Sequence, residues 1–217
     1  MAEAARIALS RVSCVHGRTQ VVREVDLVVE PGQRVALTGT NGSGKTTLLR
    51  AVLGLHRGAS GEIDVDGHRA RSAADWDRRR RIAAWIPQRQ STGRFPLLAK
   101  ELLASSGAAA EASEAARELG VGTLTGRPLH TLSGGQLQRM YLARALGCVA
   151  AGARALLADE PTAALDFAGQ EDAACLLTSL PVTLLVVTHD RTLAARCDRV
   201  LEMADGRLRE ITAEVAS

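Results

Sequence analysis

A glycine-rich segment, GTNGSGKTT, carries the residue types needed to hold a chain of phosphates. Its residues from Gly39 to Thr46 fit the spacing GxxxxGK(S/T) of phosphate-binding loops. Glycines at this spacing let backbone N–H groups turn toward phosphate oxygens, and a following helix presents its positive end to them. Lys45 is expected to reach the β- and γ-phosphates, and the Thr46 hydroxyl to hold Mg²⁺. The predicted phosphate-binding residues are Gly39, Thr40, Asn41, Gly42, Ser43, Gly44, Lys45 and Thr46.

Two acidic residues close the apolar segment ALLADE. A phosphate-binding loop needs a carboxylate for Mg²⁺ at the end of a neighbouring buried strand, and Asp159 is predicted to supply it, through water. Glu160 is predicted to polarise the attacking water as a general base. The alternative is that both acids cap the helix that follows.

These residues need a sheet whose strands end side by side. Strand patterns occur at IALSRV, VREVDLVVE, RVALTGT, GEIDVDG, RIAAWIP, ALLAD and VTLLVVT, and a hairpin is expected across Asp205-Gly206. Helical spacing occurs in KTTLLRAVLGL, from Gly134 to about Leu146, and from about Leu165. Apolar strands that alternate with helices predict a parallel sheet covered on both faces.

Length and composition indicate a folded α/β protein. The 217 residues suit one domain, and a hydrophobic content of 46% is enough to build a core. The segment from about Pro96 to Gly120 is rich in Ala, Leu and Glu between prolines and glycines, which favours a helical insertion.

The charge pattern does not propose nucleic acid as a partner. The 27 Lys and Arg residues exceed the 24 Asp and Glu residues by three, and they are spread along the chain. The exception is the cluster Arg78 to Arg81, which is expected to form a solvated helix face.

The sequence also predicts a cytosolic chain that does not cross a membrane by itself. The stretch from Cys175 to Thr188 is interrupted by Pro181 and falls short of the roughly 20 apolar residues of a membrane span. The start, MAEAARIALS, has an arginine where a signal peptide needs an apolar core. The four cysteines form no CxxC pair, so they are expected to be reduced and buried.

The motif LSGGQLQR, which begins at Leu132, separates one class of phosphate-loop ATPases from the others. Followed by ADEPTAALD, it resembles the ATP-binding cassette (ABC) family nearly end to end. The markers occur in the family's order: GTNGSGKT, Gln88 in WIPQR, LSGGQ, LLADEP, AALD from Ala163 to Asp166, and His189 in VVTHD. The resemblance implies ATP as the bound nucleotide, with Mg²⁺, and an ATPase activity coupled to transport.

The resemblance also implies the fold and the oligomeric state. The expected fold is a P-loop NTPase core with a mainly parallel sheet, an antiparallel β subdomain on its N-terminal side and a small helical insertion. Residues 1–217 are expected to form one such domain, with a helical subdomain inserted at 89–131. Ser133, Gly134, Gly135 and Gln136 form a donor-rich helix start suited to a γ-phosphate. In the family this start closes over the ATP of the other cassette, so a nucleotide-sandwich dimer, expected to be a homodimer, is predicted.

The remaining roles follow from matched positions. Gln88 is expected to contact Mg²⁺ and the attacking water, the alternative being an exposed glutamine at a strand end. His189 is expected to contact the γ-phosphate and to orient the water with Glu160, although a lone histidine is more often structural. Thr47 is assigned to the α-phosphate, and Asp166 to contact across the dimer.

Two features depart from the family pattern. Where the family has an aromatic residue that stacks on adenine, this chain has His16 in CVHGRTQVV, which implies weaker stacking and looser nucleotide selectivity. The interval from Gln88 to Leu132 is short and rich in alanine, so the surface for a partner is expected to be reduced.

A separate transmembrane permease is the expected partner, because the chain has one cassette, no fused membrane span and no long coiled-coil insertion. The chain is accordingly expected at the inner face of the cell membrane, in contact with it only through the permease. An ABC exporter subunit, or a soluble ATPase such as an iron-sulfur assembly scaffold, stays as the alternative.

The segment WIPQRQSTGRFPLLAKELL is similar to the corresponding region of metal-ion (zinc or manganese) importer cassettes. In that interpretation Phe95, Pro96, Leu97 and Leu98 help to form a groove for a coupling helix of the permease. The alternative is that FPLL packs within the helical insertion. The five histidines have no ligand spacing and do not support a metal cargo.

Overall fold

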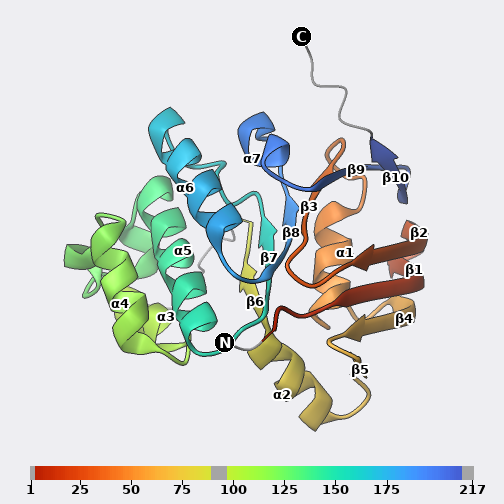
Figure 1. Cartoon of the computed structure of the whole chain (residues 1–217), viewed down its shortest axis with the longest axis horizontal. Helices are drawn as coiled ribbons and strands as arrows, with labels where there is room; N and C mark the ends of the chain where they lie inside the picture. The colour runs from red at the N-terminus through yellow and green to blue at the C-terminus, as the bar shows by residue number, and fades with distance from the viewer. Residues whose placement is uncertain (1–2, 89–96, 212–217) are drawn as a thin grey trace.

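A six-stranded sheet forms the middle of the molecule (Figure 1). The computed structural model describes residues 3–88 and 97–211. In order across the sheet, the strands are β10 (Arg207–Ile211), β9 (Arg199–Ala204), β3 (Arg34–Thr38), β8 (Thr183–Val187), β7 (Ala155–Asp159) and β6 (Ala83–Ile86). All neighbours pair in parallel except β10 and β9, which form the predicted hairpin.

The central strands are apolar throughout because both of their faces are covered. Along β3, Val35 and Leu37 belong to a core on one face, whereas Ala36 belongs to the core on the other. The first face packs against α1 (Lys45–Val52). The second packs against α5 (Gly134–Ala150), α6 (Phe167–Ser179) and α7 (Arg191–Ala195). The predicted α/β architecture is confirmed.

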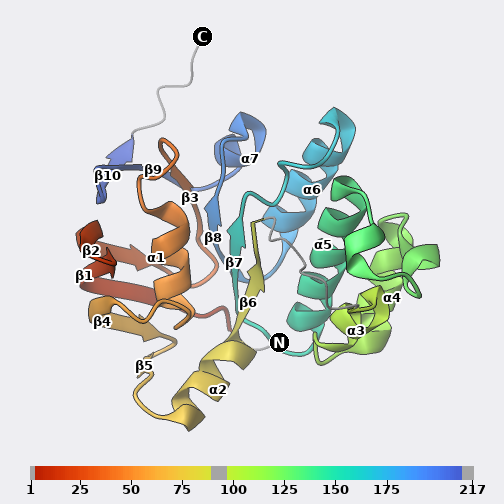
Figure 2. The same cartoon turned by 180° about the vertical axis from the view of Figure 1, so that it is seen from behind.

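A separate antiparallel sheet lies on the α1 side of the molecule (Figure 2). Its strand order is β2 (Thr19–Val29), β1 (Ile7–His16), β4 (Ala59–Val65) and β5 (His68–Arg69). The turn between β4 and β5 falls at Asp66-Gly67, as the sequence predicts.

A small helical part packs against the outer face of α5. It contains α3 (Ala99–Ala104), α4 (Ala109–Glu118) and two short 3₁₀ turns, Gly122–Leu124 and Leu129–Thr131. Small residues allow this packing: a Cβ added to Gly147 of α5 would lie 2.6 Å from the Cβ of Ala112 and 2.6 Å from Oγ of Ser106. The alanine-rich composition therefore brings these helices close together.

Several element boundaries differ from the predictions. α1 ends at Val52 rather than Leu55, because Gly54 takes a left-handed conformation (φ +73°) and the Leu55 N–H donates to the carbonyl of Arg50 at 2.8 Å. The expected helix between Pro96 and Gly120 is divided into α3 and α4. Helix α2 (Ala73–Ile82) continues into the segment expected to be a strand, so β6 starts only at Ala83.

The expectation of a fully solvated arginine cluster is wrong for Arg79, which is only 4% exposed. Its guanidinium donates to the carbonyls of Val52 (3.2 Å), Ile63 (3.0 Å) and His68 (3.0 Å). It also lies 5.0 Å from the centre of the Trp76 ring. Arg79 therefore joins α2 to the C-terminal end of α1 and to the antiparallel sheet.

We expect Arg79→Met to lower the free energy of unfolding by about 2–3 kcal/mol, because three carbonyls lose their donor inside the protein. Urea unfolding measures the change. Arg80→Met is the matched control, since Arg80 is exposed and, among residues 3–88 and 97–211, forms its ion pair with Asp77 of the same helix. It should change the free energy by less than about 0.5 kcal/mol, and equal losses in both variants would contradict the anchoring role.

Candidate functional site

The carboxyl ends of four neighbouring parallel strands bring the predicted residues to one edge of the sheet. β3 leads into the loop that starts at Gly39, β7 ends at Asp159, and Gln88 and His189 follow β6 and β8. A cavity of about 520 Å³, the Lys45 cavity, opens at this edge. Its lining includes the loop residues Asn41, Gly42, Gly44, Lys45, Thr46 and Thr47. From other elements come His16, Gln88, Asp159, Glu160 and His189.

The glycine loop is held tightly between β2 and β9. Gly39 has φ +125°, and a Cβ there would lie 2.2 Å from the carbonyl oxygen of Met203. Gly44 has φ +108°, and a Cβ there would lie 2.4 Å from the carbonyl oxygen of Val21. No side chain caps α1, whose N-cap is Gly44, so the first N–H groups of the helix are available to an anion.

Lys45 carries a positive charge beneath the loop. The residue is 7% exposed, and its Nζ donates to the carbonyls of Gly39 (2.6 Å) and Thr40 (2.8 Å). Burial lowers the pKa of Lys45, although the charges of Glu160 and Asp159 oppose the shift. The buried hydroxyl of Ser43 has no hydrogen-bond partner among residues 3–88 and 97–211. The loop thus offers an ammonium group, a hydroxyl and backbone N–H groups to an anion.

Asp159 is a buried carboxylate at the end of β7, and it is 1% exposed. In the described part of the chain, neither of its oxygens has a hydrogen-bond partner. Burial raises the pKa of Asp159, while the Thr46 hydroxyl and the charges of Arg50 and Lys45 lower it.

This environment fits Mg²⁺. Mg²⁺ is usually held by one or two carboxylates together with phosphate oxygens and water, rather than by an all-protein cage. The described residues contain no group of three or more His, Cys, Asp or Glu side chains placed to hold a metal. Asp159 and Thr46 are therefore the residues that match the ion.

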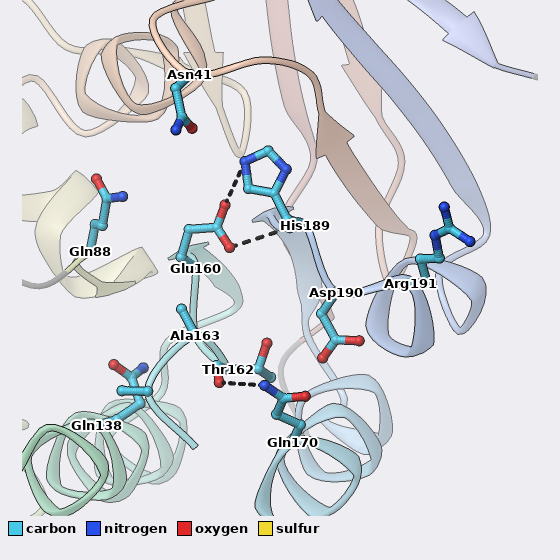
Figure 3. Close-up of a pocket in the computed structure, with 11 residues that line it drawn as sticks. Asn41, Gln88, Gln138, Glu160, Thr162, Ala163, Gln170, His189, Asp190 and Arg191 are labelled. Carbon is cyan, nitrogen blue, oxygen red and sulfur yellow. Dashed lines mark hydrogen bonds and ion pairs between the residues drawn. The ribbon is translucent and has the colours of Figure 1, made fainter. Parts of the chain in front are cut away.

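Glu160 and His189 form a pair across the ends of β7 and β8. The Glu160 N–H donates to the carbonyl of Val187 at 2.8 Å, which fixes the register of the two strand ends. The His189 N–H donates to Oε2 of Glu160 at 3.3 Å, and its Nε2 lies 3.4 Å from Oε1 (Figure 3). Burial raises the pKa of Glu160, whereas both contacts with His189 lower it. Glu160 also has a left-handed backbone, with φ +53°.

Gln88 is exposed and lies on the opposite side of Glu160 from His189 (Figure 3). His16 is the last residue of β1 and is exposed at the wall of the Lys45 cavity.

The LSGGQ residues lie elsewhere. Ser133 is the N-cap of α5, where its hydroxyl accepts the Gln136 N–H at 3.2 Å and Oε1 of Gln136 accepts the Ser133 N–H at 3.0 Å. Gly134 and Gly135 form the first turn of the helix, as predicted. Within the described residues, none of these four lines the Lys45 cavity, because α5 covers the opposite face of the sheet from α1 (Figures 1 and 2).

Asp166 caps α6. Its Oδ1 accepts the Gly169 N–H at 3.1 Å and lies 3.9 Å from Nη2 of Arg139, while most of the side chain is exposed. Its assignment to contact across a dimer stays a prediction.

The FPLL segment is described only in part, since Phe95 and Pro96 lie outside the described residues. The Leu97 carbonyl accepts the Leu129 N–H at 2.8 Å, and Leu98 forms a β-bridge with Pro128. These backbone contacts tie the two leucines to the helical part, but the Leu97 side chain is 37% exposed, so both interpretations of FPLL stay predictions.

A second cavity of about 630 Å³ shares Asn41, Gln88, Glu160 and His189 with the first (Figure 3). It adds residues that the sequence analysis did not single out: Gln138, Thr162, Gln170, Asp190 and Arg191. For Gln138, the only signal is its place two residues after LSGGQ.

Comparisons with known proteins agree with this arrangement. A family model described as "ABC transporter" matches residues 22–163, more than half of the chain. The lipoprotein-releasing system ATP-binding protein LolD of Syntrophotalea carbinolica is 38% identical over 206 residues, covering 88% of this chain and 89% of its own length. The hemin import ATP-binding protein HmuV of Bordetella avium is 36% identical over 214 residues, covering 90% and 81% respectively.

A solved structure, titled as the dimeric structure of MJ0796, a bacterial ABC transporter cassette, superposes with a TM-score of 0.84 at 28% identity. The match covers 97% of this chain and 100% of that one. Among the helices that the structure describes, none is long and apolar enough to span a bilayer. The names of the two relatives do not support the expected metal-ion importer type.

Asp159→Asn tests the proposed Mg²⁺ ligand without measuring activity. Without nucleotide, we expect the melting temperature to stay the same or to rise, because an unpaired buried carboxylate costs free energy. In the parent chain, Mg²⁺ with ATP should raise the melting temperature above the value with ATP alone, and the variant should lose that increment.

A thermal-shift assay measures both effects. Asp172→Asn, on the exposed face of α6, is the matched control and should keep the increment. If Asp159→Asn kept the whole increment, Asp159 would not be a ligand.

Proposed function

The chain belongs to the ABC transporter family, and we propose that two identical copies of it bind and hydrolyse ATP to drive a separate membrane-spanning permease. One observation carries the proposal. The Lys45 cavity has the groups to hold a triphosphate, whereas Ser133 begins the helix on the opposite face of the sheet and does not line that cavity. Each copy therefore supplies what the other is missing, in agreement with the dimeric cassette among the structural neighbours.

Nucleotide binding starts at the loop. Lys45 exchanges its bonds to the carbonyls of Gly39 and Thr40 for the β- and γ-phosphates, and Thr47 contacts the α-phosphate. Thr46 and Asp159 would hold Mg²⁺, with Gln88 in contact with it, and the bound ion would offset the negative charge of the phosphates.

Hydrolysis depends on Glu160. A water attacks the γ-phosphorus, the bond to the ADP oxygen breaks, and Glu160 accepts a proton of the water. The burial that raises the pKa of Glu160 makes it a stronger base. His189 holds this carboxylate through its backbone N–H and presents its imidazole to the γ-phosphate.

His16 contacts the base. An imidazole gives less stacking area than the aromatic ring that the family has at this place, so the triphosphate supplies most of the affinity. We expect selectivity for ATP over GTP to be lower than in a cassette with tyrosine at this position.

We expect Glu160→Gln to bind ATP but to hydrolyse it at least about a hundredfold more slowly, because the general base is lost. The ATP that it retains should hold two copies together, so size-exclusion chromatography should detect a dimer with ATP and a monomer without it. Glu114→Gln, on the exposed surface of α4, should keep the parent rate. Hydrolysis by Glu160→Gln at the parent rate would exclude Glu160 as the base.

Adding Ser133→Asp to the Glu160→Gln chain tests the second half of the site. Aspartate caps helices as well as serine does, so α5 is retained, while its charge repels the γ-phosphate of the partner's ATP. We expect unchanged ATP binding and no dimer. Ser133→Thr keeps the hydroxyl and should still dimerise, and dimers of both variants would refute the shared site.

We propose that the permease docks in a third hollow, of about 540 Å³, between the end of α1, β6 and α5. Its lining includes Leu55, which is 60% exposed, and Trp85. Arg144 also lines the hollow, and it donates to Oγ of Ser105 (2.8 Å) and to the Trp85 carbonyl (3.2 Å). Arg81 lines the hollow as well. An amphipathic permease helix fits this lining, because its apolar side chains can contact Leu55 and Trp85 and its acidic side chains can pair with the arginines.

Leu55→Asp should remove the chain from membranes without changing ATP binding, because it places a charge in the apolar part of the hollow. Recovery of the tagged chain with the membrane fraction of its native cells measures the effect. Ile211→Asp, at an exposed position of β10, is the control. Recovery of the parent chain with soluble partners only would favour the soluble assembly ATPase instead.

A further inference from the structure

Gln138 has a buried amide group that the roles above do not use. It lies in α5 and is 4% exposed, and its Nε2 has no hydrogen-bond partner in the described ranges 3–88 and 97–211. Its side chain lines the 630 Å³ cavity together with Glu160 and Ala163 (Figure 3). Ala164 belongs to the same lining. A buried donor without an acceptor costs free energy, so this N–H is available to an acceptor that comes within reach.

The loop between Glu160 and Asp166 offers such acceptors, because its residues Thr162, Ala163 and Ala164 line the same cavity as Gln138. One side of the loop is already fixed: Nε2 of Gln170 lies 3.5 Å from the Thr162 carbonyl oxygen and 3.3 Å from that of Leu165. Its other side rests on α5, where a Cβ added to Gly135 would lie 3.2 Å from the carbonyl oxygen of Ala164. The loop that carries Glu160 is therefore in contact with the first turns of α5.

We propose, building on the proposed function, that Gln138 is a positioning residue for Glu160. When two copies close on ATP, the amide N–H of Gln138 donates to a main-chain carbonyl of the Glu160–Leu165 loop and holds Glu160 in its hydrolytic position. No bond is made or broken except this hydrogen bond.

The consequence is a link between the two nucleotide sites of the dimer. Ser133 and Gln138 are five residues apart on α5, which corresponds to about 7.5 Å along a rigid helix. Contact of Ser133 with the ATP of the partner thus moves the same element that holds the Glu160 loop of its own site. Closure on one nucleotide then prepares the base that acts on the other.

Gln138→Met tests this proposal in the full chain, because it removes the amide and nearly keeps the volume. We expect the melting temperature without nucleotide to be unchanged or higher, since no hydrogen bond is lost. We expect kcat for ATP hydrolysis to fall about tenfold, because one hydrogen bond is lost in the reacting state. KM for ATP should stay unchanged.

Gln170→Met is the matched control, because its amide is already paired in the resting chain. Gln170→Met should lower the melting temperature, because a residue with a purely structural role stabilises the resting chain. The proposal is wrong if Gln138→Met keeps the kcat of the parent chain. It is also wrong if Gln138→Met loses kcat and its melting temperature falls as far as that of Gln170→Met. If the parent chain hydrolyses no ATP, the proposed function itself is wrong, and this result is distinct from a failure of the role proposed for Gln138.

Discussion

A carboxylate buried without a hydrogen-bond partner is unfavourable, and Asp159 occupies that position at the end of β7. The surroundings only partly offset this, through the charges of Lys45 and Arg50 and the hydroxyl of Thr46. A binding site differs from a stable core in this respect, because its polar groups are satisfied by the ligand rather than by each other. Asp159 depends on the sheet, since β7 is covered on both faces and so places this carboxylate deep in the protein.

The position of α1 is fixed at both ends, and this keeps Lys45 and Thr46 beside Asp159. At its N-terminus, the glycine loop is enclosed by β2 and β9 so closely that Gly39 and Gly44 have no room for a side chain. At its C-terminus, the guanidinium of Arg79 donates to the carbonyl of Val52. A helix held in this way does not need to move when phosphate binds, so little of the binding free energy is spent on ordering the site.

Much of the site could be predicted because its residues follow strands, and strand ends can be recognised in a sequence. Asp159 and His189 each close or follow an apolar segment, and parallel pairing brings such ends to one edge. The burial of Arg79 could not be predicted, because its acceptors Val52, Ile63 and His68 come from three other elements. The sequence alone does not show which of the four adjacent arginines is buried, because tertiary packing decides it.

Ser133 and Lys45 cannot meet by a rearrangement of one folded chain. The two lie on helices that cover opposite faces of the central sheet, and that sheet is the core of the protein. Closing the gap within a chain would mean unfolding the core, whereas the proposed second copy, related by a twofold axis, would supply the missing half without strain. Because such an axis would pair the sites reciprocally, the Glu160–Asp166 loop, which touches the start of α5 and carries the proposed base, lies between the two roles proposed for a chain. In the proposed dimer, cooperation between the sites would depend on the contact of this loop with α5, including the hydrogen bond proposed for Gln138.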